Sequence, residues 1–388
     1  MKKLWHYFTF WRAVLGVLLL AGAYITFLRF TQGLGAVTNL SDQFPWGLWI
    51  GFDILCGVGL AAGGFTLCAI VYIFNIESFR PIVRPAVLTA FLGYLLVIVA
   101  LLYDLGRPDR IWHALVMWNP RSVMFEVAWC VMLYTTVLAL EFSPILFEKL
   151  GWNKAVRFMH TITIPLVILG VILSTLHQSS LGSLYLIVPE KLHPLWYSPL
   201  LPVFFYLSAI GVGCAMVIFE SFMSSRAFKR EIEMPILTQL GRVIVVVLMV
   251  YAVIKAQDLL DRGVFSTMWT LSLETMLYWV EIGFGVLLPM LLLAIPRVRN
   301  HATGLFVSAL LVVLGFVLNR MNVSITGMEG WAKVGYFPSW MEITITVTIV
   351  AVGFALFALA ARYLPVFPAA EREHAKESED LSWAAQQS

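Results

Sequence analysis

The stretch Phe44–Phe74, FPWGLWIGFDILCGVGLAAGGFTLCAIVYIF, decides the fold of this chain. From Gly47 onward it runs for 28 residues with a single charge, Asp53. About 20 apolar residues are enough to cross the hydrocarbon core of a bilayer. A carboxylate inside a membrane costs at least about 2.5 kcal/mol, so it usually faces the protein interior and marks a proton, ion or substrate path. The stretch therefore predicts a transmembrane helix that carries a functional Asp53.

Glycine spacing places this helix at the centre of the protein. Gly47 and Gly51, and then Gly59 and Gly63, form two pairs of small residues four positions apart. Such pairs let neighbouring backbones approach closely inside a membrane. A helix that faces lipid on most sides would not need such pairs, so this helix is expected to pack against several others.

The composition fixes the class of the whole chain. Of its 388 residues 60% are apolar and 13% are charged, and the mean hydropathy is +0.85. These values are typical of an all-α polytopic membrane protein. The net charge of +3 carries little information, and no nucleic-acid partner is expected.

Ten apolar segments are long enough to span a membrane. The first is interpreted as an uncleaved helix, because its apolar run continues past the cleavage-like Ala21-Gly22-Ala23 to Phe30. We expect a ten-helix domain over residues 1–368 and a polar, disordered cytoplasmic tail over 369–388. The segments cover roughly residues 11–30, 47–74, 81–104, 122–142, 156–176, 201–224, 240–258, 273–295, 302–320 and 340–363.

The distribution of Lys and Arg predicts the orientation. With the N-terminus inside, 17 of the 26 basic residues fall on the inner side and 9 on the outer side. The positive-inside rule then places both termini in the cytoplasm. The longer loops, 31–46, 104–121, 177–200 and 321–339, all lie outside, so docking and chemistry are expected on the outer, periplasmic face.

Two outer motifs could hold a ligand at the membrane edge. The third segment ends in YDLGRPDRIWH, with Asp104, Arg107 and His113, and the fifth ends in STLHQSS, with His177. Arg107 belongs to a cluster of basic residues in this connection, with Arg110 and Arg121. The cluster could contact a partner or ligand, and ordinary surface charge explains it as well. An imidazole with a pKa near 6.5 is well suited to exchange protons with a quinol, although His177 could also merely end its helix.

Two more carboxylates fall in otherwise uncharged runs. Glu126 lies about one turn inside the outer end of the fourth segment, and Glu220 lies near the inner end of the sixth. Each is interpreted either as part of a proton path or as a structural group. Glu281 in the eighth segment has a weaker claim, and Glu342 is expected to serve as a helix N-terminal charge.

Neither haem nor an iron–sulfur cluster is expected in this chain. The four cysteines lie in apolar runs and form no CxxC motif, so no metal site is predicted. A bis-histidine haem needs two imidazoles that meet from different helices at one depth. None of the seven histidines lies in the middle of a predicted segment, and His160 and His177 share one helix about 25 Å apart.

Several of these motifs together resemble the NrfD/PsrC family of integral membrane quinone-interacting subunits. The similarity runs from about residue 30 to 368, and the ten segments fit its HybB branch, which serves periplasm-facing uptake nickel–iron hydrogenases. The motifs are FPWGLWIGFD, DLGRPDRIWH, SVMFEVAWC, HQSSLGSL, HPLW and VIFE.

The resemblance implies two four-helix bundles with flanking helices and no bound prosthetic group. It implies a periplasmic ferredoxin-like iron–sulfur partner, hydrogenase large and small subunits, and electron transfer to menaquinone or ubiquinone near the outer edge of the inner membrane. The family's quinone-pocket residues match Asp104 and His177. Its proton-path carboxylates match Glu126, and the resemblance extends this role to Asp53 and Glu220.

Alternative functions remain open at this point. The same role in a nitrite, polysulfide or multihaem cytochrome complex would use the same motifs. A secondary transporter would show broken helices and a site near the midplane, whereas the motifs here gather at the outer edge. A passive anchor would leave Asp53 and Glu126 without a role. Sequence alone also leaves open whether protons reach the quinone from the cytoplasm, which would make turnover electrogenic.

Overall fold

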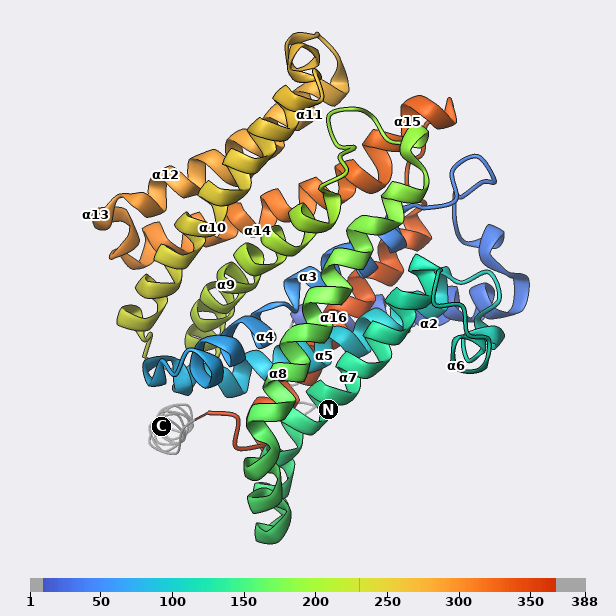
Figure 1. Ribbon diagram of the computed structural model, residues 1–388. Helices are drawn as coiled ribbons and strands as arrows, with labels where there is room; N and C mark the ends of the chain where they lie inside the picture. Colours follow the sequence, from blue (N-terminus) through green and yellow to red (C-terminus); the bar gives the residue numbers. More distant parts are fainter. Residues whose placement is uncertain (1–9, 230, 368–388) are drawn as a thin grey trace.

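The computed structural model describes residues 10–229 and 231–367. Over these residues it contains helices and no strands, and ten helical stretches are long and apolar enough to cross a membrane (Figure 1). The predicted all-α polytopic membrane protein with ten spans is confirmed. The spans are α2 (Phe10–Gln32), η2 to η3 (Trp49–Ile73), α5 (Arg80–Asp104), α7 (Val123–Leu150), α8 (Asn153–Ser183), α9 (Leu201–Phe228), α10 (Met234–Asp261), α11 to α12 (Leu273–Ala294), α14 to α15 (Ala302–Ala332) and α16 (Trp340–Tyr363).

The spans form two four-helix bundles with two flanking helices. The first bundle consists of the second span with α5, α7 and α8, and the second consists of α9, α10, the α11–α12 span and α14. The bundles meet where α9 packs against α8 and against α4 (Gly63–Cys68). Helix α16 packs on α5 of the first bundle and on α2, which completes the flank (Figure 1).

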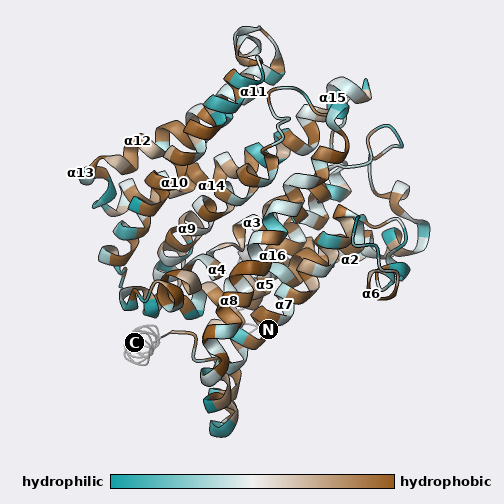
Figure 2. Cartoon of the chain, viewed as in Figure 1, coloured by the Kyte–Doolittle hydropathy of each residue, from teal (hydrophilic) through white to brown (hydrophobic). Residues whose placement is uncertain are grey.

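Apolar side chains cover the outside of this assembly as well as its core. Apolar residues run along the helices, whereas hydrophilic residues gather at helix ends and in loops (Figure 2). Exposed large side chains such as Leu20, Val253, Phe284 and Phe354 sit on the outer faces of their helices. This pattern is that of a protein whose solvent is lipid, because hydrocarbon imposes no cost on an outward-facing Leu or Phe.

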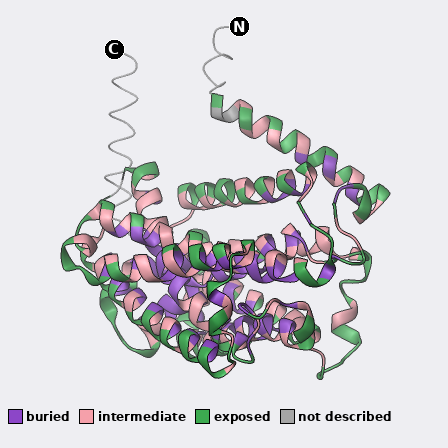
Figure 3. Cartoon of the chain, turned by 90° about the horizontal axis from the view of Figure 1, so that it is seen from above, coloured by how far each residue is buried: buried purple, intermediate pink, exposed green. Residues whose placement is uncertain are grey.

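The second span is the most enclosed, with 72% of its most apolar window buried, as its glycines predict. Buried residues gather in the middle of the assembly (Figure 3). A Cβ added to Gly59 would lie 2.1 Å from Phe316 Cζ, and one added to Gly213 of α9 would lie 2.8 Å from the Ala62 carbonyl carbon. The predicted span is confirmed, and within it a two-residue turn at Ala61 and Ala62, both with right-handed helical dihedral angles, separates α3 (Gly57–Leu60) from α4. Its ends, η2 (Trp49–Cys56) and η3 (Ala69–Ile73), are π-helical, a form often found at functional sites.

Long connections lie at one end of the bundles, called here the long-loop end, and short ones at the opposite, short-loop end. Two of the four long connections are shorter than predicted. Helix α8 and η6 (Leu184–Ile187) carry the fifth span beyond residue 176, and η10 (Asn322–Thr326) with α15 (Gly327–Ala332) extends the ninth. Which end faces the cytoplasm stays a prediction, and the expected tail, 369–388, lies outside the described residues.

Candidate functional site

His177 lies inside α8 and is fully buried, so the expectation that it sits at the end of its span is wrong. Its Nδ1 is 2.9 Å from the hydroxyl oxygen of Tyr94 on α5, and the two rings are tilted against each other. The imidazole is thereby fixed between two helices of the first bundle rather than at the membrane edge.

The polar run HQSS continues the helix because its hydroxyls are satisfied within the helix itself. Ser179 and Ser180 donate to the carbonyl oxygens of Thr175 and Leu176, at 2.8 and 2.7 Å. Such bonds to the preceding turn remove the cost of a hydroxyl in an apolar setting. A hydropathy profile scores these residues as polar and ends the span too early.

Glu126 lies in the first turn of α7, whose N-cap is Ser122. Its Oε1 accepts a hydrogen bond of 2.6 Å from the Ser180 hydroxyl, which lies one turn beyond His177 on α8. The structure therefore brings Glu126 and His177 to the same pair of helices, in the half of the first bundle nearer the long-loop end.

Asp104 and Asp53 face the flanking helices instead. Asp104 ends α5, where Arg29 of α2 attracts its carboxylate and donates to the carbonyl oxygens of Tyr103 and Leu105, at 2.7 and 2.5 Å. Asp53 is 6% exposed and accepts a 2.7 Å hydrogen bond from Thr346 of α16. These contacts tie the first bundle to the flank.

Asp104 and His177 do not face each other at one depth. Tyr94, the partner of His177, precedes Asp104 by ten residues on α5, which corresponds to about 15 Å along the helix axis. The two side chains therefore lie in two separate polar regions. The His177 region lies between α5, α7 and α8.

Arg107 and His113 lie in the loop after α5. Arg107 forms an exposed ion pair with Asp109, with an Nη2–Oδ2 distance of 2.9 Å, and its hydrogen bonds lower the pKa of Asp109. His113 begins the short helix α6 (His113–Val116) and packs its ring against Trp112. Among the described residues neither makes a hydrogen bond to Asp104 or His177.

Glu220 lies on α9 toward the short-loop end. It accepts a hydrogen bond of 2.7 Å from Thr89 of α5, so it joins the two bundles at that end. The sequence predicted the position of Glu220 along its span, whereas its contact with α5 is seen only in the structure. Glu342 caps α16 as predicted, since Ser339 and Glu342 form a reciprocal capping box.

The second bundle contains a buried polar network that the sequence did not reveal. Glu281 accepts hydrogen bonds from Asn319, Asn322 and Trp196, at 2.7, 2.8 and 2.8 Å. Arg320, 1% exposed, donates to Asn319 and lies 3.6 Å from the Phe205 ring centroid. The charge distribution assigns Arg320 to the nine basic residues of the outer side. Its position in a long apolar run was the feature of the sequence that could have indicated a buried arginine.

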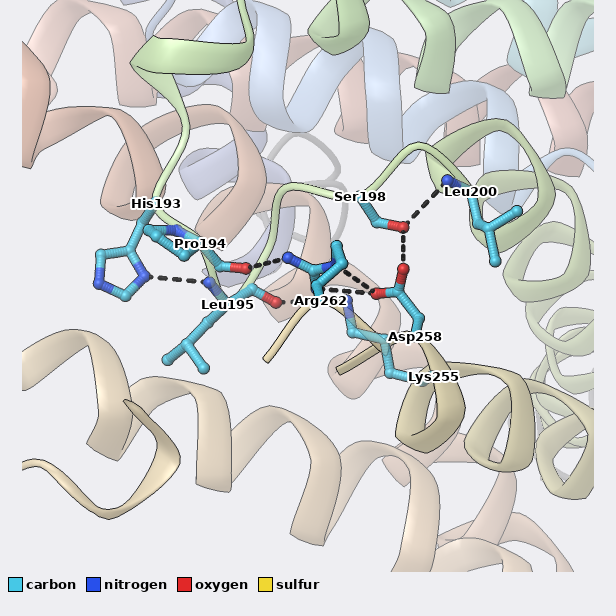
Figure 4. Close-up of polar contacts among 8 residues, drawn as sticks. All are labelled: His193, Pro194, Leu195, Ser198, Leu200, Lys255, Asp258 and Arg262. Atoms are coloured by element: carbon cyan, nitrogen blue, oxygen red, sulfur yellow. Dashed lines mark hydrogen bonds and ion pairs between the residues drawn. The ribbon is translucent and has the colours of Figure 1, made fainter. Parts of the chain in front are cut away.

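Lys255 and Asp258 of α10 and its C-cap residue Arg262 hold the connection between the bundles (Figure 4). Asp258 accepts from Ser198 at 2.6 Å and pairs with Arg262, while Lys255 donates to the carbonyl oxygen of Leu195 at 3.3 Å. Their spacing of three, four and seven residues puts them on one face of the helix. That periodicity was visible in the sequence.

Comparisons with known proteins agree with this architecture. Residues 36–329 match the family described as polysulphide reductase, NrfD. The chain is 35% identical to the probable Ni/Fe-hydrogenase 2 b-type cytochrome subunit of Escherichia coli, over 88% of each chain. It is 30% identical to the menaquinone reductase integral membrane subunit of Nitratidesulfovibrio vulgaris, over 93% of this chain and 92% of that one. It is also 26% identical to a selenate reductase subunit of Mesobacillus selenatarsenatis, over 96% of each. This multi-pass membrane protein therefore belongs to the NrfD, or polysulphide reductase, family.

Proposed function

We propose that this chain is the membrane-anchoring, quinone-binding subunit of a respiratory oxidoreductase of the nickel–iron hydrogenase type. A periplasmic ferredoxin-like iron–sulfur subunit, bound at the long-loop end beside the hydrogenase large and small subunits, supplies two electrons. The chain holds menaquinone or ubiquinone from the membrane pool and supplies two protons, so that quinol is released to the bacterial inner membrane. The names of the hydrogenase and menaquinone reductase relatives support this assignment.

One observation carries the proposal: a row of polar side chains inside the first bundle. The row runs from Glu126 at the long-loop end through Ser180 to His177 and Tyr94. Polar and titratable groups are expensive within a membrane and are retained where protons or substrates move. A quinone whose head group enters beside this row would find a carboxyl group, a hydroxyl group and an imidazole within one bundle.

Each predicted site residue has a place in the proposal. Glu126 and His177 supply protons, and Asp53 and Glu220 are further carboxylates of the proton path. Asp104 borders the pocket on the side of the flanking helices. The exposed loop with Arg107 and His113 meets the partner subunit or the head group from outside.

No haem is included in the proposal, although one relative is named a b-type cytochrome subunit. Of the described histidines, His177 alone is buried inside a span, and its ring faces the Tyr94 hydroxyl. Bis-histidine ligation needs a second imidazole at that depth on a facing helix. His160 is about 25 Å away along the same helix. The described residues therefore do not fit a bis-histidine haem.

The test separates quinone chemistry from the rest of the complex. Because His177 is fully buried, His177→Gln is a better variant than His177→Ala, since Gln fills space and still bonds to Tyr94. In the purified complex, His177→Gln and Asp104→Asn should each lower quinone reduction at least tenfold while reduction of a soluble dye persists. Glu231→Gln, an exposed position in the connection after α9, is the control.

Normal quinone reduction in both test variants would place the pocket elsewhere. Co-purification in mild detergent identifies the partner. Large subunits of a menaquinone or selenate reductase in place of a hydrogenase would keep the quinone chemistry and change the complex.

A further inference from the structure

We infer that Glu141 and the cavity beside it form the proton inlet of the quinone site, leading from the short-loop end to His177. The inference rests on the proposed function and adds a route and a residue to it. The sequence predicted neither a role for Glu141 nor a cavity at this place.

The cavity has a volume of about 600 Å³ and opens between α5, α7, α8 and η3. Since a water molecule takes up about 30 Å³ in the liquid, this space holds many of them. The polar side chains on its wall come from these four elements and from Cys68 at the end of α4, and they are Cys68, Tyr72, Arg80, Arg84, Glu141, His160 and Thr163.

Glu141 is the carboxylate on this wall. It lies nine residues before the end of α7 at Leu150, or about 14 Å into the span. Within the described part of the chain its carboxyl group makes neither a hydrogen bond nor an ion pair with protein. A carboxylate at such depth is costly unless it is hydrated or protonated, so a water-filled cavity is the setting it requires.

Other charged groups at the cavity are already occupied or lie at its mouth. Arg84 is held by Glu148 in a two-pronged pair, with distances of 2.7 and 2.9 Å, and Arg80 is paired with Glu77 at 3.0 Å. His160 is exposed at the short-loop end of α8. The remaining titratable groups on the wall are the Tyr72 hydroxyl and the Cys68 thiol.

From Glu141 the path continues inward through two tyrosines. A Cβ placed on Gly170 would lie 3.5 Å from Glu141 Oε1 and 3.7 Å from Tyr134 Cε2, so the carboxyl group and the ring both lie beside the bare Gly170 backbone. Tyr134 packs edge-on against Tyr94, with ring centroids 4.7 Å apart. Tyr94 then contacts His177 directly.

Unpaired polar atoms mark the same path. Among the described residues, four buried atoms here have no hydrogen-bond partner: Tyr134 Oη, Ser174 Oγ, His177 Nε2 and Gln178 Oε1. Buried polar atoms in native proteins are nearly always satisfied by protein or by ordered water. This cluster is therefore where a short water chain would join the cavity to His177.

One face of α8 links these features. Residues 163, 167, 170, 174 and 177 recur every three or four positions, so they share that face. Residues 163 and 167 line the cavity. Residues 174 and 177 carry two of the unpaired atoms, and residue 170 lies between them and the cavity. The stripe covers about 21 Å of the span.

The chemistry balances with the proposed function. Each quinone takes two electrons from the iron–sulfur partner and two protons, which enter through Glu141 and reach the quinone from His177 and Glu126, giving one quinol. Glu141 never touches the quinone, so it is a proton-relay residue. With the predicted orientation, in which the short-loop end is cytoplasmic, each turnover moves charge across the membrane.

The test uses the intact complex in proteoliposomes with Glu141→Gln, Glu141→Asp and the exposed control Glu231→Gln. Gln preserves shape and hydrogen bonding but cannot carry a proton. We expect Glu141→Gln to keep subunit stoichiometry, quinone occupancy and dye reduction while quinol formation falls at least tenfold. Glu141→Asp should restore the rate to within about threefold, since proton transfer needs only a titratable group of similar acidity. Glu231→Gln should match the wild type.

Quinol formation by Glu141→Gln within twofold of the wild-type rate would overturn the inference and leave the proposed function intact. Absence of quinone reduction in the wild-type complex would overturn the proposed function itself. A pH dye placed on either side of the membrane adds a second criterion, since uptake of substrate protons from the long-loop side also contradicts the inlet.

Hydration of the cavity is tested without turnover. A water-soluble, membrane-impermeant thiol reagent applied at the short-loop side should label Thr163→Cys, identified by mass spectrometry of its peptide. Thr136→Cys, at mid-span on the lipid-exposed side of α7, should remain unlabelled. An unreactive Thr163→Cys would show that the cavity is closed to water and would refute the inlet even if Glu141→Gln failed to assemble.

Discussion

Glu281→Gln tests whether the buried network of the second bundle stabilises the fold through the charge of this carboxylate. Glu281 is 1% exposed at the end of α11, and its two oxygens accept from three donors. Oε1 takes one bond, from Asn319, and Oε2 takes two, from Asn322 and Trp196. A glutamine has nearly the same shape but only one acceptor oxygen.

The expected cost follows from this geometry. If the amide oxygen replaces Oε2, the new NH₂ group faces the Asn319 NH₂ group, and two donors oppose each other. Asn319 cannot reverse its amide without losing the 2.6 Å bond that its oxygen accepts from Arg320. One hydrogen bond to a charged group is worth about 1.5–3 kcal/mol in soluble proteins, and measured bonds between membrane helices reach about 1.7 kcal/mol. We therefore expect a loss of about 2 kcal/mol.

The assay is reversible unfolding in mixed micelles, compared with the wild type and with Glu190→Gln in the exposed linker. Glu190→Gln should stay within about 0.5 kcal/mol of the wild type, as surface substitutions usually do. A Glu281→Gln protein that is equally stable would refute the reasoning, since it would show that the three bonds do not depend on the carboxylate charge.

Three further predictions follow from the sequence and the fold. A reporter fused after Ser388 should be active only in the cytoplasm and one inserted near Lys191 only outside; the opposite pattern would reverse both membrane sides. The purified chain should contain quinone and show no Soret band in a reduced-minus-oxidised spectrum, and such a band from this chain alone would contradict the absence of haem. Glu126→Gln can still accept the Ser180 hydrogen bond, so assembly should persist while quinol formation drops tenfold or more. Near-normal turnover would make Glu126 an anchor for α8.

Local sequence was a good guide to Glu126, Glu220 and Glu342, because the depth of each follows from counting residues along one span. It was a poor guide to His177. A hydropathy profile assigns HQSS to the start of a loop. In the structure the helix continues through it, because the two serine hydroxyls donate hydrogen bonds to carbonyl oxygens of the preceding turn. A one-dimensional scale cannot register a polar group that is satisfied within its own turn.

The sequence by itself determined the ten spans, the class of protein and the central place of the second span, since the length of an apolar run and the spacing of glycines are local properties. Only the tertiary structure decided which polar groups meet. Arg320 and Lys255 are buried in polar contacts, and Glu141 lines a cavity, because their surroundings come from helices far away in the chain. In hydrocarbon a polar group is stable only beside a partner or water, so its role depends on what the fold places next to it.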